Sequence, residues 1–151
     1  MQALFAKIIA FFMSILAFFG LVKPTEGPSR FEGDYLVNVN AQQIEFQLDA
    51  NATTGYQWGY SIDGDAVEKT DDHYEVYEHE AGMVGVGGVQ FFTFNAVKPG
   101  ISIVVFNYAR AWENEEPIGT RAFRITVSED MSITYETMMT EAVFSSLPST
   151  P

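Results

Sequence analysis

The feature that most constrains this fold is a two-residue period in hydrophobicity, which recurs in short stretches between residues 35 and 135. Polar residues alternate with apolar ones, and glycine, proline or asparagine separates one stretch from the next. The alternating apolar residues are Tyr35, Val37, Val39, Ile44, Phe46, Leu48, Tyr56, Trp58, Tyr60, Ile62, Phe123, Ile125, Val127, Ile133 and Tyr135. Successive side chains of a strand point to opposite faces, so each stretch predicts a strand with one buried face.

Two further stretches, residues 89–96 and 101–108, are almost continuously apolar and are joined by the turn sequence Val97-Lys98-Pro99-Gly100. No part of the region 34–136 carries the 3.6-residue apolar stripe of a helix. Six or seven short strands separated by turns are typical of a sandwich or barrel. The sequence therefore predicts an all-β domain over residues 34–136, with about seven antiparallel strands.

Composition limits what this domain can bind. A chain of 151 residues has room for one domain plus tails, and 47% hydrophobic residues suffice for one core. The absence of cysteine excludes disulfides, thiolate zinc sites and a cysteine nucleophile. The formal net charge of −12 argues against nucleic acid as a partner, because phosphate contacts need clustered lysine and arginine. It favours a partner with a basic surface or rim.

The N-terminus carries a separate apolar run over residues 8–22, which follows Lys7. The run is short for a full membrane span, and no good small-residue cleavage site follows it. We expect residues 1–22 to be either a signal peptide or a retained N-terminal membrane anchor. In both cases the domain is exported and is periplasmic, secreted or held at the outer face of a membrane, which it contacts only through an uncleaved segment.

The segments that flank the domain have the composition of connections. Residues 23–33 contain two prolines and two glycines, which predicts a linker. Residues 137–151 lose the alternating pattern and end in serine, threonine and proline, which predicts a mostly disordered tail. Within the tail, the stretch Met138–Phe144 has room for one short helix.

A first unusual loop follows the second predicted strand at Asn51–Gly55. Asn51, Thr53 and Thr54 can bond neighbouring backbone groups, and Gly55 can adopt a positive φ. The loop can therefore hold a rigid, protruding shape. Taken alone, it is better interpreted as an ordinary tight turn.

A second unusual loop, Gly82–Gly88, contains four glycines and ends in Gly85-Val86-Gly87-Gly88. Side chains leave this backbone uncovered, so another chain can approach its N–H and C=O groups. A flexible hairpin tip is the alternative interpretation. A phosphate-binding loop is not favoured, because no Lys-Ser/Thr pair follows and the preceding segment is acidic.

A third loop opens with Ala109-Arg110-Ala111-Trp112 and continues to Gly119. Arginine and tryptophan are residue types enriched at binding hot spots. The alternative is a tryptophan folded back over the end of the sandwich. If loops between alternate strands cluster at one end, as in immunoglobulin-like sandwiches, all three loops form one surface.

An acidic segment, Asp63–Glu80, also contains His73 and His79, which invites a metal or acid–base interpretation. Alternation places His73, Glu75 and Tyr77 on one strand face. Charge runs usually face water, so we expect a solvated acidic edge. The sequence also has no defensible nucleophile–base arrangement. It therefore predicts no enzyme, metal site or cofactor.

Together, the three loops carry a resemblance to a known family. The order Asn51-Ala52-Thr53-Thr54-Gly55-Tyr56, Gly85-Val86-Gly87-Gly88 and Arg110-Ala111-Trp112 resembles that of the chagasin family of cysteine protease inhibitors. The family pattern has an Asn-Pro-Thr-Thr-Gly-Tyr loop, a Gly-x-Gly-Gly loop and an Arg-Pro-Trp loop. The resemblance covers residues 34–127 of a cysteine-free β domain.

This resemblance implies an immunoglobulin-like sandwich, monomeric when free, that inserts the three loops into the cleft of a papain-like cysteine protease. Thr53 and Thr54 would cover the catalytic cysteine and histidine. Gly85, Val86, Gly87 and Gly88 would follow the substrate groove, and Trp112 would pack beyond it with Arg110 supporting its loop. Inhibition would be competitive and reversible. The alternative is an exported interaction module without a protease target, for which Trp112 is buried and the loops lie apart.

The sequence departs from the family pattern at both prolines, which are Ala52 and Ala111 here. Each change frees the unbound loop at a cost of roughly 0.4–1 kcal/mol. The first also makes Asn51-Ala52-Thr53 an N-glycosylation sequon. A glycan on Asn51 would cover the loop, so an inhibitor of this kind is expected from a cell that leaves the site unmodified, most simply a bacterium.

Overall fold

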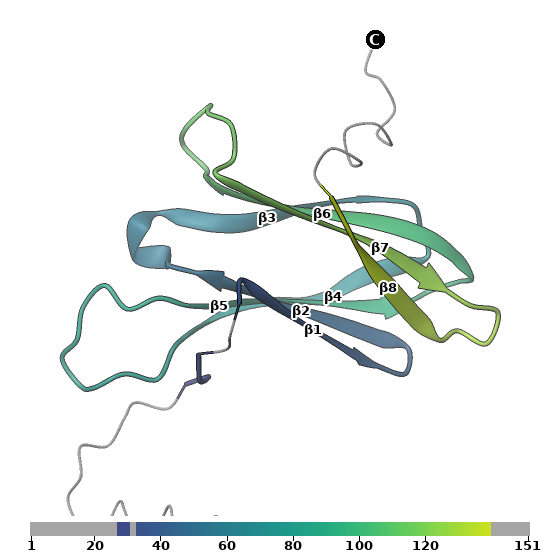
Figure 1. Ribbon diagram of the computed structural model, residues 1–151, viewed down its shortest axis with the longest axis horizontal. Helices are drawn as coiled ribbons and strands as arrows, with labels where there is room; N and C mark the ends of the chain where they lie inside the picture. The colour runs from purple at the N-terminus through teal and green to yellow at the C-terminus, as the bar shows by residue number, and fades with distance from the viewer. Residues whose placement is uncertain (1–26, 31–32, 140–151) are drawn as a thin grey trace, which may run out of the picture.

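A computed structural model describes residues 27–30 and 33–139 of the chain, and Figure 1 shows its arrangement. The described part is built from strands and contains one short 3-10 turn, η1 (Ala52–Thr54), between β2 and β3. The strands are β1 (Tyr35–Asn40), β2 (Gln43–Ala50), β3 (Tyr56–Asp63), β4 (Val67–Val76), β5 (Gly88–Ala96), β6 (Gly100–Arg110), β7 (Gly119–Val127) and β8 (Ile133–Met138).

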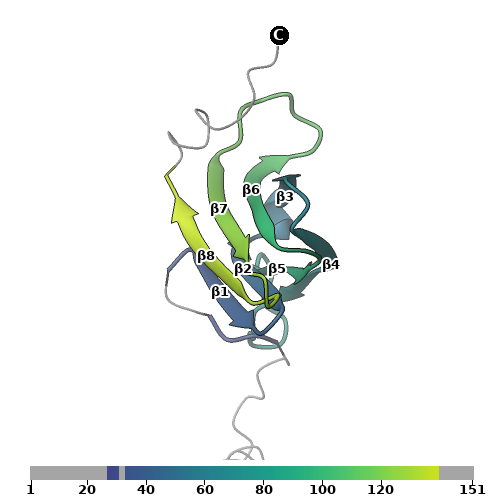
Figure 2. The same cartoon turned by 90° about the vertical axis from the view of Figure 1, so that its right-hand side faces the viewer.

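The strands form two four-stranded antiparallel sheets, with the orders β1-β2-β5-β4 and β3-β6-β7-β8. Figure 2 shows the two sheets stacked face to face. The prediction of an all-β antiparallel sandwich is therefore confirmed. The turn at 97–100 does not close a hairpin: β5 and β6 lie in different sheets, so it carries the chain from one sheet to the other.

Strand β4 is the element that the hydrophobic period did not predict, and it raises the number of strands from about seven to eight. Only Val67 of its ten residues is buried. It is an edge strand that, among the described strands, pairs with β5 alone, with a register shift between Lys69 and Asp71. The acidic run is solvated, as expected, but most of it belongs to a regular strand.

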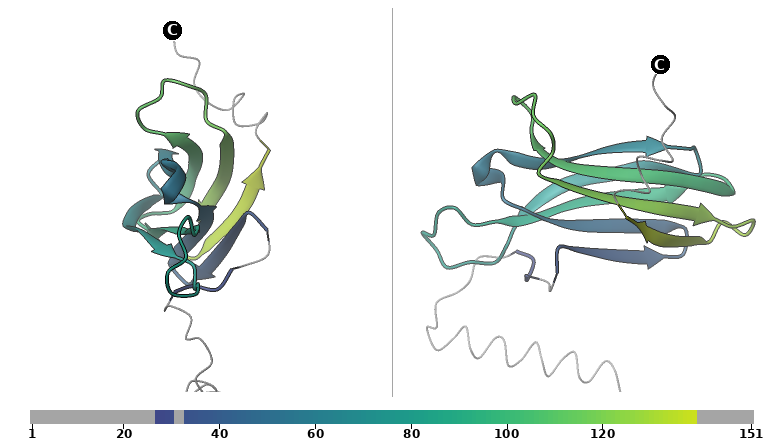
Figure 3. Two further views of the ribbon diagram at one scale, coloured as in Figure 1. Left: turned by 90° about the vertical axis from the view of Figure 1, so that its left-hand side faces the viewer. Right: turned by 45° about the horizontal axis from the view of Figure 1, so that its top comes forward.

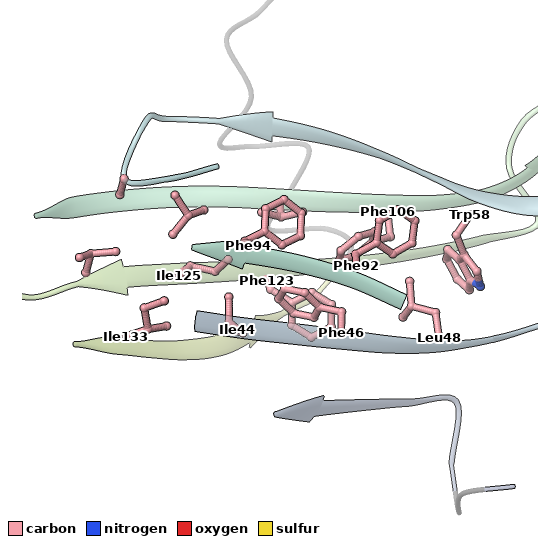
Figure 4. Close-up of a cluster of buried hydrophobic side chains, with 14 of the residues drawn as sticks. Ile44, Phe46, Leu48, Trp58, Phe92, Phe94, Phe106, Phe123, Ile125 and Ile133 are labelled. Carbon is pink, nitrogen blue, oxygen red and sulfur yellow. The ribbon is translucent and has the colours of Figure 1, made fainter. Parts of the chain in front are cut away.

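The core lies between the sheets and is dominated by phenylalanine (Figure 4). Phe46 of β2 reaches across to the other sheet, where its ring centroid lies 5.1 Å from that of Phe106 and 4.7 Å from that of Phe123. Trp58 closes one end of this core and donates its indole N–H to the Asp49 carbonyl at 2.9 Å. Packing is thus the main source of stability in a chain without disulfides.

The alternating set on β3 is buried only in part. Trp58 is 7% exposed, but Tyr60 and Ile62 are 38% and 37% exposed. The reason is that β3 is an edge strand, so its side chains are covered from one side only. Tyr60 still faces inward, with its ring 5.8 Å from that of Phe94.

Strand register places three connections at the same end of the sandwich. Ala50 and Val76 both pair with Gly88, which sets the β2–β3 and β4–β5 connections side by side. Tyr56 pairs with Arg110, which adds the β6–β7 connection to the same end. In Figure 1 these connections lie on the left.

Several sequence predictions fall outside the described residues. These are the signal peptide or anchor at residues 1–22, most of the linker at 23–33, and the tail from residue 140 onward with most of the proposed helix. Strand β8 continues to Met138, two residues into the segment expected to be tail. Among the residues that the structure describes, no helix is long and apolar enough to span a membrane.

Candidate functional site

Three loops converge at one end of the sandwich. We call them the threonine loop (Asn51–Gly55), the glycine loop (Tyr77–Gly87, between β4 and β5) and the tryptophan loop (Ala111–Ile118, between β6 and β7). Viewed end-on in the left panel of Figure 3, the threonine loop lies between the other two. The fold thus brings all three candidate motifs to one surface of the domain.

The threonine loop is held in shape by its own hydrogen bonds. The Asn51 side-chain oxygen accepts from the Thr53 N–H at 3.1 Å and also from the Thr53 hydroxyl. The Thr54 hydroxyl donates to the Asn51 carbonyl at 2.7 Å. Gly55 ends the turn with a φ of 82°, which glycine adopts without strain. These contacts cap η1 and leave Thr53 and Thr54 exposed at its tip.

Two tyrosine hydroxyls anchor this loop to both sheets. The Asn51 N–H donates to the Tyr108 hydroxyl at 2.9 Å, and the Ala52 N–H donates to the Tyr74 hydroxyl at 3.4 Å. Tyr108 belongs to β6 and Tyr74 to β4, so the loop bridges the mouth of the sandwich. Sequence reasoning missed both residues. The hydrophobic period indicates the face of a tyrosine ring but not the partner of its hydroxyl.

The tryptophan loop packs against the threonine loop through Trp112, which is 70% exposed. A Cβ added at Gly55 would lie 2.1 Å from the Trp112 ring, so a larger residue there would displace the indole. Arg110 links the two loops: its Nε donates to the Thr54 carbonyl at 3.0 Å, and its guanidinium lies 4.3 Å from the Tyr56 ring centroid. Glu113 pairs with the same guanidinium at 3.2 Å.

The glycine loop contacts the other side of the threonine loop. The Asn51 side-chain amide donates to the Gly85 carbonyl at 3.2 Å, where Gly85 has a φ of 72°. This amide nitrogen is the attachment atom of the sequon, so a glycan would lie between two of the loops. Gly87 accepts the Tyr77 N–H at 3.0 Å, and Val86 packs on the buried Tyr77 cluster. Within the described residues, the N–H groups of Gly85 and Val86 donate to no protein acceptor.

Gly88 differs from the other glycines of this motif. It is the first residue of β5, is buried, and pairs with both Ala50 and Val76. A Cβ at this position would lie 2.3 Å from the Glu75 carbonyl oxygen. The expectation that the Gly88 backbone is open to another chain therefore does not fit its position, and the sheet itself requires glycine here.

The histidine of β4 sits outside this three-loop site. His73 lies beside Glu75, as predicted, and also beside Asp71, and its ring stacks on Phe91 at 4.5 Å. Tyr77, the third residue of the predicted face, lies just past the end of β4. Across the described ranges, no three histidine, aspartate or glutamate side chains are placed to hold a metal ion. The three loops themselves contain no lysine or arginine but carry acidic residues on both flanks: Glu78, Glu80, Glu113, Glu115 and Glu116.

Comparison with known proteins agrees with the motif pattern. The model of a family described as chagasin family peptidase inhibitor I42 matches residues 38–127, more than half of the chain. Amoebiasin-2 of Entamoeba histolytica is 27% identical over 85 residues, which cover 56% of this chain and 69% of that protein.

A solved structure gives the same relationship. The crystal structure of the cysteine protease inhibitor EhICP2 from Entamoeba histolytica is 27% identical in sequence, with a TM-score of 0.51. The match covers 56% of this chain and 77% of that one. The resemblance drawn from the three motifs is thus confirmed, and the family is one of inhibitors rather than enzymes. The chain belongs to the chagasin family of peptidase inhibitors.

Proposed function

We propose that this protein is a reversible, competitive inhibitor of papain-like cysteine proteases that inserts its three loops into the active-site cleft. The observation that carries the proposal is the convergence of the loops on one end, joined by the Asn51–Gly85 and Arg110–Thr54 hydrogen bonds. A related structure described as a cysteine protease inhibitor supports the class of target. The exposure of Trp112 also favours this function over an interaction module in which that residue is core.

Each loop has a proposed role that the family resemblance implies and that the chemistry of the loop supports. Thr53 and Thr54, at the tip of a hydrogen-bonded turn, cover the catalytic pair without presenting an extended, cleavable peptide. The Gly85 and Val86 N–H groups bond the substrate groove of the protease as the edge of a strand does. Trp112 supplies a large apolar anchor beyond the cleft. Neither a covalent bond nor a metal is needed for this mode of binding.

The direct test is a titration of papain with the full chain. We expect a stoichiometric loss of activity that substrate competes away and that dilution reverses. Thr53→Lys should weaken inhibition by about 30-fold or more, because it places a long charged side chain at the tip that enters the cleft. The measurement is the inhibition constant from steady-state rates.

Lys69 of β4 lies outside the three loops. Lys69→Thr therefore exchanges the same two residue types, in the opposite direction, at a position away from the site, and serves as the control. It should leave the inhibition constant unchanged. Retained papain activity at micromolar wild-type protein would refute inhibition of this protease class. Equal inhibition by wild type and Thr53→Lys would instead refute the central place of the threonine loop.

Acidic residues on both flanks of the site give a second expectation, that the protease carries a basic rim. Glu115 and Glu116 are exposed, whereas the charge of Glu113 is offset by Arg110. Attraction between exposed charges is screened by salt, so the association rate should fall severalfold between about 20 and 300 mM salt. Stopped-flow measurement on Glu115→Gln/Glu116→Gln should show a shallower dependence. An association rate that does not change with salt concentration would contradict this expectation.

We further propose that inhibition takes place outside the cytoplasm, because the apolar run at residues 8–22 is suited to export. Fractionation of the native cells tests this proposal. Recovery of the protein with cytoplasmic markers alone would overturn it.

A further inference from the structure

A short segment ahead of the domain, Gly27–Arg30, lies against the base of the glycine loop (Figure 1, purple). The Pro28 carbonyl accepts the Glu78 N–H at 3.1 Å, and the Ser29 hydroxyl donates to the Glu78 carboxylate at 3.1 Å. The Arg30 guanidinium lies 4.8 Å from the centre of the Tyr77 ring. We call Gly27–Arg30 the brace segment. It lies outside the region that matches the family model.

The fit of the brace segment is tight at its first residue. A Cβ added to Gly27 would lie 2.4 Å from the Val76 carbonyl oxygen, which is backbone and cannot swing aside. Val76 is the last residue of β4, an edge strand that has β5 as its single partner among the described strands. The bond from Glu78 to Pro28 therefore continues backbone pairing on the outer edge of β4, at the point where this strand becomes the glycine loop.

The brace segment acts on the residue that fixes the glycine loop to the domain. Tyr77 is 2% exposed, its N–H donates to the Gly87 carbonyl at 3.0 Å, and its hydroxyl donates to the Asp49 carboxylate at 2.6 Å. Burial, with the Asp49 carboxylate as a second cause, raises the pKa of Tyr77 well above its usual range, so the hydroxyl stays a donor. Tyr77 thus ties both ends of the loop to β2.

Beyond this base, the outer part of the glycine loop is joined to the threonine loop by the Asn51–Gly85 hydrogen bond. This outer part contains two glycines, Gly82 and Gly85, and its Met83 and Val84 are 56% and 93% exposed. A loop of this composition takes many conformations unless its ends are fixed, and each conformation lost on binding weakens association. The brace segment covers the first two residues, Tyr77 and Glu78, and so limits the freedom of the whole loop.

We propose that Gly27–Arg30 is a positioning element of the inhibitory site, which holds the glycine loop in the conformation that binds the protease. The proposal rests on the proposed function for its effect on inhibition. Its effect on the loop does not depend on that function, so the two are separable by experiment.

The test compares Gly27→Ala with Gly59→Ala in the full chain. The first variant forces the brace segment away from Val76, whereas a Cβ at Gly59 meets no atom within 4 Å. We expect Gly27→Ala to inhibit papain about 3- to 10-fold more weakly than wild type. Amide hydrogen exchange over residues 78–87 should become faster in the same variant, while β6 and β7 exchange as in wild type. Gly59→Ala should match wild type in both measurements.

A second variant, Ser29→Ala/Arg30→Gln, removes the side-chain contacts without a backbone clash and should shift both measurements in the same direction. Unchanged exchange in the glycine loop of Gly27→Ala would overturn the proposal. Faster exchange with unchanged inhibition would overturn its link to binding. If wild type does not inhibit papain, the proposed function fails, and the exchange measurement still decides whether the segment braces the loop.

Discussion

Trp112→Ala is expected to weaken protease inhibition by about 2 kcal/mol or more, roughly 30-fold, while leaving the melting temperature nearly unchanged. The side chain is 70% exposed, so its removal takes little apolar surface out of the folded domain. Tryptophan truncations at interface centres are among the costliest, because a large ring leaves water on binding. The effect should therefore appear in the complex and not in the free protein.

The contact of Trp112 with Gly55 adds a second route to the same loss. Without the indole, one wall of the threonine loop is gone, although the Arg110 bond to the Thr54 carbonyl remains. Trp112→Phe separates the two causes. A phenyl ring keeps part of the anchor but fills less space over Gly55. The inhibition constant of Trp112→Phe should therefore lie between those of wild type and Trp112→Ala.

The measurement pairs inhibition constants with thermal unfolding, and Ile101→Ala is the matched control. Ile101 is also a large exposed apolar residue, at 55%, but it lies at the opposite end of β6. Its removal should change neither quantity. A fall of many degrees in the melting temperature of Trp112→Ala would show that the ring belongs to the fold. Unchanged inhibition by Trp112→Ala would show that Trp112 is not part of the protease-binding surface.

The sequence predicted those parts of the fold that hydrophobic burial governs. Ile44, Phe46 and Leu48 alternate on β2 and are fully buried, so their period of two indicated both strand and face. Strand β4 was missed because an edge strand with solvated faces needs no apolar alternation. Its strand structure comes from backbone pairing with β5, and pairing between distant segments leaves no local signal.

The candidate site shows the same division. Motif order was enough to select the three loops, but their convergence depends on strand register, which sets Ala50 and Val76 opposite one residue. The brace segment was interpreted from its composition as a plain linker. Its contacts join Pro28 to Glu78, which is fifty positions away. Neither segment carries a sequence pattern that predicts this pairing.

The structure also bears on Ala52, one of the two alanines that stand where the family pattern has proline. Freedom at Ala52 was expected to weaken the threonine loop, yet the loop is closed by Asn51, by the Thr54 hydroxyl and by Gly55. The Ala52 N–H also has an acceptor in the Tyr74 hydroxyl, a bond that proline cannot make. Local hydrogen bonds thus offset part of the restraint that a proline ring would supply.

The largest effect on stability is expected at Phe46, where substitution by alanine should lower the free energy of unfolding by about 3–5 kcal/mol. Phe46 is 0% exposed, and its ring contacts Phe94 of its own sheet as well as Phe106 and Phe123 of the other. Removing the Phe46 ring leaves a cavity between the two sheets, at the place where they pack against each other. The total free energy of unfolding of a native protein is about 5–15 kcal/mol, so this loss is a large part of the total.

Denaturant unfolding followed by tryptophan fluorescence measures this loss, because Trp58 is buried at the end of the same core. Phe46→Leu keeps most of the apolar volume and should cost clearly less. A change below about 1 kcal/mol in Phe46→Ala would mean that the sheets close over the cavity. The folded fraction of Phe46→Ala should still inhibit papain as wild type does, because its site is held by separate contacts at Tyr108, Arg110 and Asn51.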